Sequence, residues 1–355
     1  MADFTSALYL GLAHDHASLR PWQQFTSGKP AVLQTTPGTL SLAGDLALLT
    51  GCEAATIAPS TLHLFLDVFC LWPHQRTTAI YMDEALYQIG SWGIERAAGR
   101  GIRVRRFRHQ DPHSLSRSLL SDDPRTAVVV TDGFCPDCAK PAPLREYLDC
   151  LAGRKGWLVI DDTQAIGVLG RNPSPAAPLG LGGGGVMSLL NLRDSRVVLI
   201  CSLAKAFGVP MAFLAGARPL VDRFEQIAET RVHCSPVALP VLHAAEHAMA
   251  FNEHGGDRAR TVLAQWIARL QTKLGASRFR PSGGLFPVQS FTGFNGLPAE
   301  EIHRRLASSG IQTVLQRRRT SGEPQVAVLL TARHTAREID KLCSTVLALE
   351  DHCHA

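Results

Sequence analysis

Short runs of apolar residues alternate with amphipathic stretches through the middle of the chain, from residue 54 to residue 217. The apolar runs have the length and β-branched content of buried strands, and the amphipathic stretches are long enough to form crossover helices. This alternation predicts an α/β fold, in which helices cover both faces of a mostly parallel, seven-stranded sheet. The expected strands are residues 54–58, 77–82, 102–107, 126–132, 157–161, 196–201 and 212–217.

The pattern changes after the last of these strands. Residues 220–275 read as long helices with few turn signals, and a turn followed by a strand begins near residue 276. The alternation of strand and helix that follows predicts a smaller α+β domain at the C-terminus. We therefore expect an N-terminal segment (residues 1–35), a large domain (residues 36–275) and a small domain (residues 276–355).

A segment rich in proline and glycine, residues 171–190, precedes the sixth expected strand. This composition favours a flexible loop. Its four consecutive glycines leave a second reading open, a close approach of the backbone to a phosphate group.

Polar residues follow two of the expected strands directly. The fifth strand ends in Asp161, with Asp162 and Gln164 just beyond it. The sixth strand is followed by Ser202 and Lys205. Because ligands of open α/β sheets bind beyond the carboxyl ends of the strands, we expect one site here. A lysine amine and a carboxylate suit pyridoxal 5'-phosphate (PLP), whose aldehyde binds an amine and whose ring nitrogen pairs with a carboxylate. Asp162 is the weaker candidate, since its side chain points to the other face of the strand.

Composition and charge narrow the functional class. The chain of 355 residues is 45% hydrophobic and 19% charged, which is typical of a globular enzyme. Its net charge of +5 favours small anionic substrates but does not indicate nucleic-acid binding. The sequence has no signal-peptide pattern and no apolar stretch of transmembrane length, so we expect a cytosolic protein without a membrane partner. Nine irregularly spaced cysteines read as reduced thiols.

The sequence around the strand ends resembles the fold-type-I PLP enzymes of the class I/II aminotransferase superfamily, most closely the α-oxoamine synthases. The run S-L-A-K-A-F-G around Lys205 is similar to the family's T-L-S-K-A-F-G. Residues 129–144, 107–115 and 329–340 are also similar to family segments. The resemblance extends from about residue 8 to about residue 350.

The resemblance implies roles for the residues nearest the cofactor ring. Lys205 would hold PLP as an aldimine and then act as general acid–base at the substrate Cα, while Asp161 would keep the ring nitrogen protonated. Tyr87 takes the place of a ring-stacking histidine, although it also fits an ordinary core tyrosine. Gln164 replaces a histidine near the ring oxygen and can donate the same hydrogen bond without carrying charge.

Four further residues match positions around the cofactor. Ser202 matches a threonine expected near the phosphate, and Ser60 and Thr61 match a segment at a helix start, where backbone N–H groups bind anions. A plain helix N-cap explains Ser60 and Thr61 nearly as well. Asp132 takes the family's acidic position in residues 129–144.

One departure from the family pattern concerns the substrate carboxylate. The family places a carboxylate-binding arginine where this chain has Ala327. A bidentate arginine is hard to replace, so we expect that the substrate carboxylate is bound differently or is absent. Arg333 and the run Arg317, Arg318 and Arg319 are nearby in sequence, and such a run either forms a solvated face or contacts substrate.

Cys135 and Cys138 form a single C-x-x-C pair, which is weak evidence for zinc without a second pair. His352, Cys353 and His354 near the C-terminus offer further ligands, but tails are commonly disordered. We therefore predict no metal site.

The resemblance implies a homodimeric transferase that condenses an amino acid, or another amine-bearing substrate, with an acyl-CoA or carrier-bound thioester. An aminotransferase or another PLP-dependent lyase on the same scaffold is the alternative. A non-catalytic binding protein is a third reading, but such a protein needs neither Lys205 nor Asp161.

Overall fold

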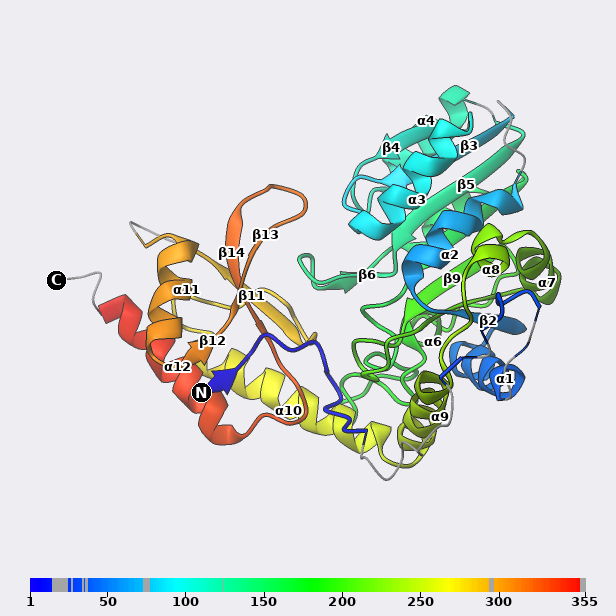
Figure 1. Ribbon diagram of the computed structural model, residues 1–355. Coiled ribbons are helices and arrows are strands. Elements are labelled where there is room, and N and C mark those ends of the chain that lie inside the picture. The colour runs from blue at the N-terminus through cyan, green and yellow to red at the C-terminus, as the bar shows by residue number, and fades with distance from the viewer. Residues whose placement is uncertain are drawn as a thin grey trace.

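The computed structural model describes residues 1–14, 25–26, 28–33, 35, 38–72, 77–122, 124–293 and 297–351. His352, Cys353 and His354 lie outside these residues. Figure 1 shows a larger and a smaller body, with helix α10 (Gly256–Leu274) running from the larger one into the smaller.

The larger body is built on a seven-stranded sheet with the order β2-β10-β9-β8-β5-β3-β4. Its strands are β2 (Ala54–Ala58), β3 (Thr78–Asp83), β4 (Arg103–Phe107), β5 (Thr126–Asp132), β8 (Gly156–Asp161), β9 (Val197–Ser202) and β10 (Ala212–Gly216). Strand β10 runs antiparallel to the other six strands of this sheet, which are parallel to one another. The predicted α/β fold is thus confirmed, and every expected strand is present with its ends within one residue.

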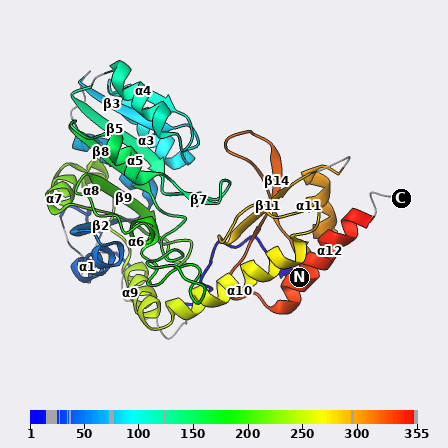
Figure 2. The same cartoon turned by 180° about the vertical axis from the view of Figure 1, so that it is seen from behind.

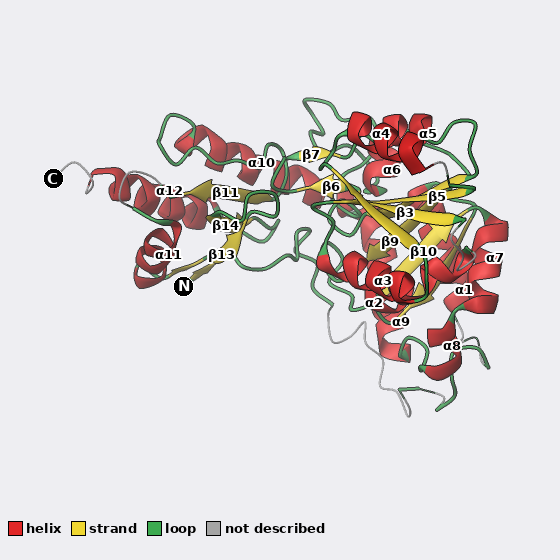
Figure 3. Cartoon of the chain, turned by 90° about the horizontal axis from the view of Figure 1, so that it is seen from above, coloured by secondary structure: helices red, strands yellow, loops and turns green. Residues whose placement is uncertain are grey.

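Side chains that alternate along the strands divide the apolar residues between two cores. In β3, Ala79 and Tyr81 belong to one core, whereas Ile80 and Met82 belong to the other. Figure 3 shows one group of helices on each face of the sheet. The first face carries α4 (Pro112–Asp122) and α5 (Leu144–Cys150), and the second carries α2 (Thr61–Val68) and α3 (Gln88–Gly99). Burial of both faces explains why the strands read as continuous apolar runs.

The glycine-rich segment differs from the flexible loop expected there. It contains the backbone bridges Ile166↔Gly184 and Arg171↔Leu181, followed by the short helix α6 (Gly185–Leu189). Gly183 and Gly185 have positive φ angles of 70° and 72°. A Cβ on Gly185 would collide with Asp162, so these glycines allow close packing within the protein.

Further helices complete the larger body. They are α1 (Thr39–Thr50), the 3-10 turn Phe69–Leu71, α7 (Arg218–Ile227), α8 (Glu229–His233) and α9 (Leu239–His254). A small hairpin, β6 (Phe134–Cys135) and β7 (Lys140–Pro141), projects from this body toward the smaller one (Figure 2).

The smaller body contains a three-stranded antiparallel sheet with the order β11-β14-β13. Its elements are β11 (Val288–Thr292), α11 (Ala299–Ser308), β12 (Ile311–Gln312), β13 (Val314–Arg317), β14 (Pro324–Leu329) and α12 (Ala336–Asp351). The N-terminal strand β1 (Ala2–Asp3) pairs in parallel with β12, so the start of the chain packs against the smaller body. None of the described helices is both long and apolar enough to span a membrane.

Candidate functional site

Parallel pairing brings several of the expected site residues to one edge of the large sheet. Asp132 and Asp161 are the last residues of β5 and β8, and they are register partners. Ser202 is the last residue of β9, which pairs with β8 on its other side. Strand β10 lies between β9 and β2, and its Ala212 is the register partner of both Ser202 and Ala58, the last residue of β2. The carboxyl ends of four parallel strands therefore share this edge, as the sequence predicted.

Lys205 lies in the turn between β9 and β10, on the wall of a cavity of about 200 Å³. Burial lowers the pKa of its amine to about 8; Arg319 also lowers it, whereas Asp161 and Asp132 oppose the shift. Within the described parts of the chain, the amine has no hydrogen-bond or ion-pair partner. Lys205 is therefore a partly desolvated amine that loses its proton more easily than an ordinary surface lysine.

The two neighbouring carboxylates at the end of β8 point in different directions. Asp161 is 6% exposed and accepts a 3.0 Å hydrogen bond from the Thr163 N–H. Asp162 is fully buried and accepts a 2.9 Å hydrogen bond from the Val186 N–H of α6. Asp161, and not Asp162, is among the charges that act on the Lys205 amine together with Asp132.

Tyr87, at the start of α3, places its ring near Lys205 and Arg319, two residues that line the cavity. The Lys205 Nζ lies 6.0 Å from the centroid of its ring, and the Arg319 Cζ lies 4.9 Å from it. Its backbone N–H donates a 3.2 Å hydrogen bond to Asp132 Oδ1. The ring is 47% exposed, so Tyr87 is not the ordinary core tyrosine that the sequence left open.

Asp132 links the two bodies at this point. Its Oδ2 forms an ion pair with the guanidinium of Arg319, which comes from the turn between β13 and β14. Burial raises the pKa of Asp132 above its ordinary value, and the nearby Asp161 raises it further, while Arg319 acts in the opposite direction.

Gln164 also lines the cavity, and its orientation is set by a residue that the sequence reasoning missed. The Tyr9 hydroxyl donates a 3.1 Å hydrogen bond to Gln164 Oε1. The NH₂ group of the amide thus remains available to donate. Tyr9 is 155 residues away along the chain, and no local pattern connects it with Gln164.

Ser202, Ser60 and Thr61 lie near the same sheet edge, but their hydroxyl contacts in the structure are local. Ser202 Oγ accepts a 3.2 Å hydrogen bond from the Ala204 N–H, and the Ser202 N–H donates to Thr163 Oγ1. Ser60 occupies the N-cap position of α2 without a side-chain capping bond, and its Oγ lies 2.8 Å from His63 Nδ1. Thr61 is the first residue of α2.

The four arginines near Ala327 have different environments. Ala327 itself is fully buried in β14. Arg333 donates to the Gly11 carbonyl, and Arg317 donates to the Gly322 carbonyl at 3.0 Å. Arg318 pairs through its backbone with Glu323. Arg319 contacts both Tyr87 and Asp132, and only it among the four makes a contact with the expected site residues.

These residues suit PLP on structural grounds. A desolvated amine that has no hydrogen-bond or ion-pair partner among the described residues lines the cavity, and a buried carboxylate (Asp161) and an aromatic ring (Tyr87) lie near that amine. An amine, a carboxylate and an aromatic face are the groups that this cofactor needs. The guanidinium of Arg319 lies over the same aromatic ring, so a ligand stacked on Tyr87 would contact or displace it.

The sequence is similar to those of known enzymes. The chain is 30% identical over 353 residues to 8-amino-7-oxononanoate synthase of Halorhodospira halophila, and the match covers 96% of this chain and 83% of that protein. The enzyme of the same name from Alcanivorax borkumensis is 27% identical over 248 residues, but only 61% of its length is matched. No protein-family model matches the chain.

Solved structures share the fold. The 8-amino-7-oxononanoate synthase of Francisella tularensis superposes with a TM-score of 0.77 at 19% identity, covering 100% of this chain and 99% of that one. A serine palmitoyltransferase solved with PLP superposes with a TM-score of 0.84 at 16% identity, covering 99% of this chain and 88% of that one. Since the first relative is matched over nearly the whole chain, this protein belongs to the α-oxoamine synthase family of PLP-dependent enzymes.

Proposed function

We propose that this protein is a PLP-dependent α-oxoamine synthase, which joins an amino acid to the acyl group of a thioester. One observation supports the proposal: Lys205 lines a cavity, and the Asp161 carboxylate lies near enough to affect the pKa of its amine, in a chain that belongs to this family. In the overall reaction, the new carbon–carbon bond forms at the substrate Cα, the carboxylate leaves as carbon dioxide, and the thioester releases a free thiol.

Bound PLP supplies an aldehyde for covalent attachment and a ring that accepts the electron pair left at the substrate Cα. In this proposal Lys205 binds that aldehyde. Its pKa of about 8 keeps a useful fraction of the amine neutral near pH 7, so the lone pair is available. The same Nζ would also move the proton at the substrate Cα as general acid–base.

Asp161 accepts the hydrogen bond of the protonated ring nitrogen. Its burial at the strand end strengthens that interaction, since water competes little there. Tyr87 offers its ring for stacking, and the Gln164 amide, held by Tyr9, donates a hydrogen bond to the ring oxygen. Ser202, Ser60 and Thr61 supply hydroxyl and backbone donors for the phosphate at the same edge of the sheet.

Arg319 takes over the binding of the substrate carboxylate. It is a guanidinium from the small domain whose only described anionic side-chain partner is Asp132, and it reaches the wall that carries Lys205. A carboxylate entering the cavity can share this guanidinium through charge-assisted hydrogen bonds.

We also propose that the protein is a cytosolic homodimer. Two large apolar side chains of α1, Leu40 and Leu48, are 76% and 82% exposed, and Tyr87 leaves the site open on one side. The eight cysteines within the described residues are all free, as in a reducing compartment. Light scattering on the purified protein should give twice the chain mass; a monomer at micromolar concentration would contradict the dimer.

The test of the function separates condensation from transamination. Purified protein loaded with PLP is mixed with panels of amino acids and acyl-CoA thioesters, and the released thiol and carbon dioxide are measured together. Equal amounts of both products support the synthase. Conversion of the bound cofactor to its pyridoxamine form, without carbon dioxide, would instead support the aminotransferase alternative.

A further inference from the structure

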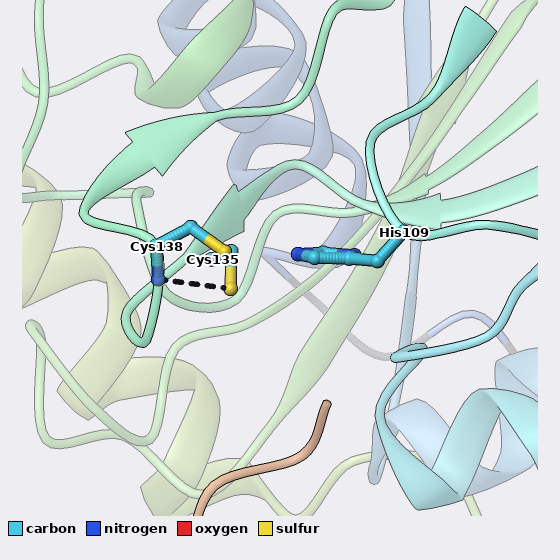
Figure 4. Close-up of side chains that lie close together, drawn as sticks. All are labelled: His109, Cys135 and Cys138. Carbon is cyan, nitrogen blue, oxygen red and sulfur yellow. Dashed lines mark hydrogen bonds between the residues drawn. The ribbon is translucent and has the colours of Figure 1, made fainter. Parts of the chain in front are cut away.

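A cluster of one imidazole and two thiols lies beside the cavity but is not used by the proposed reaction. It consists of His109, from the turn after β4, together with Cys135 of β6 and Cys138 in the β6–β7 turn. One donor atom from each residue lies within 4.8 Å of the other two. Figure 4 shows the His109 ring pointing toward the sulfur of Cys135, with Cys138 beside it.

The imidazole of His109 is held in a defined orientation. Its Nδ1 lies 2.7 Å from Oδ1 of Asp83, a carboxylate that is 1% exposed. Asp83 is itself fixed by hydrogen bonds from the Ala85 and Gln110 N–H groups. The other ring nitrogen, Nε2, is buried and has no hydrogen-bond partner within the described residues. A carboxylate on one histidine nitrogen and a free second nitrogen is the arrangement that orients histidine ligands of metals.

The two thiols are held on one side of a tight turn. The Cys138 N–H donates a 3.3 Å hydrogen bond to Cys135 Sγ, and Ala139 has a positive φ of 55°. The intervening residue Asp137 is tied to the small domain, because its two oxygens accept hydrogen bonds from the Arg319 N–H and from Gln325 Nε2. The turn that carries both sulfurs is therefore anchored at its tip.

We propose that His109, Cys135 and Cys138 form a binding site for a single thiophilic divalent ion, with zinc as the best fit. Two thiolates and one imidazole match the ligand preference of zinc. Donors on one tetrahedral zinc lie roughly 3.3–3.8 Å apart, so small side-chain rotations close the site around the ion. Three protein ligands leave the fourth position to water or to a substrate oxygen.

The sequence pattern predicted no metal site, because the C-x-x-C pair has no second pair. The fold adds His109, which is distant from the two cysteines in sequence and lies in residues 107–115, a segment similar to the family pattern. The ion would hold the β6–β7 hairpin in place at the wall of the cavity, since Cys135 lines the same cavity as Lys205. The inference does not depend on the proposed function.

Cobalt(II) is the probe for the test. Reduced, PLP-loaded protein is stripped with a chelator and titrated with Co²⁺, and zinc-loaded protein serves as the spectroscopic blank because Zn²⁺ has no d–d bands. We expect one equivalent of Co²⁺ per chain, with thiolate-to-cobalt charge-transfer absorption and tetrahedral d–d bands. Elemental analysis of the protein purified from zinc-supplemented medium should give one zinc per chain.

Matched variants assign the site. Cys138→Ser, at a half-buried position, should lower the affinity for Co²⁺ at least roughly tenfold and weaken the charge-transfer band. Asp83→Asn should lower the affinity by about ten- to hundredfold while both thiolates remain. Cys70→Ser, and the combined change of His352→Ala, Cys353→Ser and His354→Ala, should leave binding unchanged. Circular dichroism and the visible PLP band verify that each variant is folded.

Three outcomes would overturn the site. The first is reduced wild-type protein that binds no stoichiometric Co²⁺ through thiolates, including a Cys135–Cys138 pair that only forms a disulfide. The second is folded Cys138→Ser protein with unchanged affinity and spectrum. The third is loss of binding in the C-terminal variant, which would place the ion on the tail.

Discussion

The two sides of the candidate site are built in different ways. The side proposed for the cofactor consists of strand ends, where hydrogen-bond register and the pleat fix the direction of Asp132, Asp161 and the turn to Lys205. The side proposed for the substrate carboxylate is the turn between β13 and β14, which contributes Arg319. The first side keeps the lysine and the carboxylate of the family pattern in Lys205 and Asp161, although Tyr87 and Gln164 replace histidines, whereas the second has Ala327 in place of the family's arginine. The rigid strand ends thus keep the residues proposed to act on the cofactor, whereas the surface turn can change the residue proposed to bind the substrate.

The largest expected effect comes from removing the amine. Lys205→Ala should abolish covalent attachment of PLP and lower turnover by about a hundred- to ten-thousandfold or more, because both attachment and proton transfer are lost. Borohydride reduction followed by peptide mapping should label the wild type at Lys205 and leave the variant unlabelled. Lys155→Ala, an exposed lysine, is the control. Labelling at another lysine in the wild type would contradict the assignment of Lys205 as the residue that attaches PLP.

Asp161→Asn should have the next largest effect. The variant keeps its size and should still attach PLP, but the ring nitrogen loses its partner, so turnover should fall on the order of a hundredfold. Steady-state kinetics and the visible spectrum measure these two quantities separately. Asp149→Asn, at an exposed carboxylate, controls for loss of charge. Near-wild-type turnover would refute the role of Asp161.

Arg319→Ala tests the side of the cavity that departs from the family. Loss of a charge-assisted pair costs about 1.5–3 kcal/mol, so the affinity for the amino acid should fall roughly ten- to hundredfold. The apparent KM should carry most of this loss, and an amine without a carboxylate should be unaffected. Arg319→Lys should recover part of the affinity, because it keeps the charge but not the fork geometry.

Arg317→Ala is the matched control for Arg319→Ala, because Arg317 lines the same cavity while donating to Gly322. If the two variants lose the same affinity, the carboxylate is not bound by Arg319 in particular. If neither variant changes it, the substrate carboxylate is held elsewhere or is absent.

The smallest expected effect is a shift in pH dependence that links the two sides. Only the neutral amine of Lys205 attacks the PLP aldehyde, so the rate of cofactor attachment should rise about tenfold per pH unit below pH 8 and level off above it. Arg319 lowers the pKa of Lys205 and Asp161 raises it. Arg319→Ala should therefore move the midpoint to higher pH and Asp161→Asn to lower pH.

Each shift of the midpoint should change the rate of cofactor attachment at pH 7 by less than about tenfold. Stopped-flow absorbance measures the midpoints, and shifts of the opposite sign would contradict this electrostatic account.

The strands were predictable because burial on both faces leaves a strong apolar signal in each run. Asp161 and Lys205 were predictable for the same reason, since each directly follows such a run. From the sequence, Arg319 was only one of four candidate arginines, and Tyr9 was not indicated at all. Their partners, Asp132 and Gln164, are 187 and 155 residues away, and only the tertiary fold brings them together.

The glycine-rich segment shows a second limit of sequence patterns. Its composition reads as flexible, yet its glycines are needed because the backbone passes close to the buried side chains of Asp162 and Arg260. Composition alone does not distinguish a mobile glycine from one that is required by close packing.

The position of Arg319 on a turn has a consequence for protein engineering. On a strand, a side chain keeps its face of the sheet only when it is shifted by two residues, because a shift of one residue turns every side chain of the strand to the opposite face. A side chain on a turn is free of that restriction, since one residue can be added or removed there while β13 and β14 stay paired. Replacing this turn alone can therefore move the Arg319 guanidinium closer to the site or farther from it, or exchange it for another side chain. This makes the β13–β14 hairpin the natural segment to vary in order to change which amino substrates the protein binds.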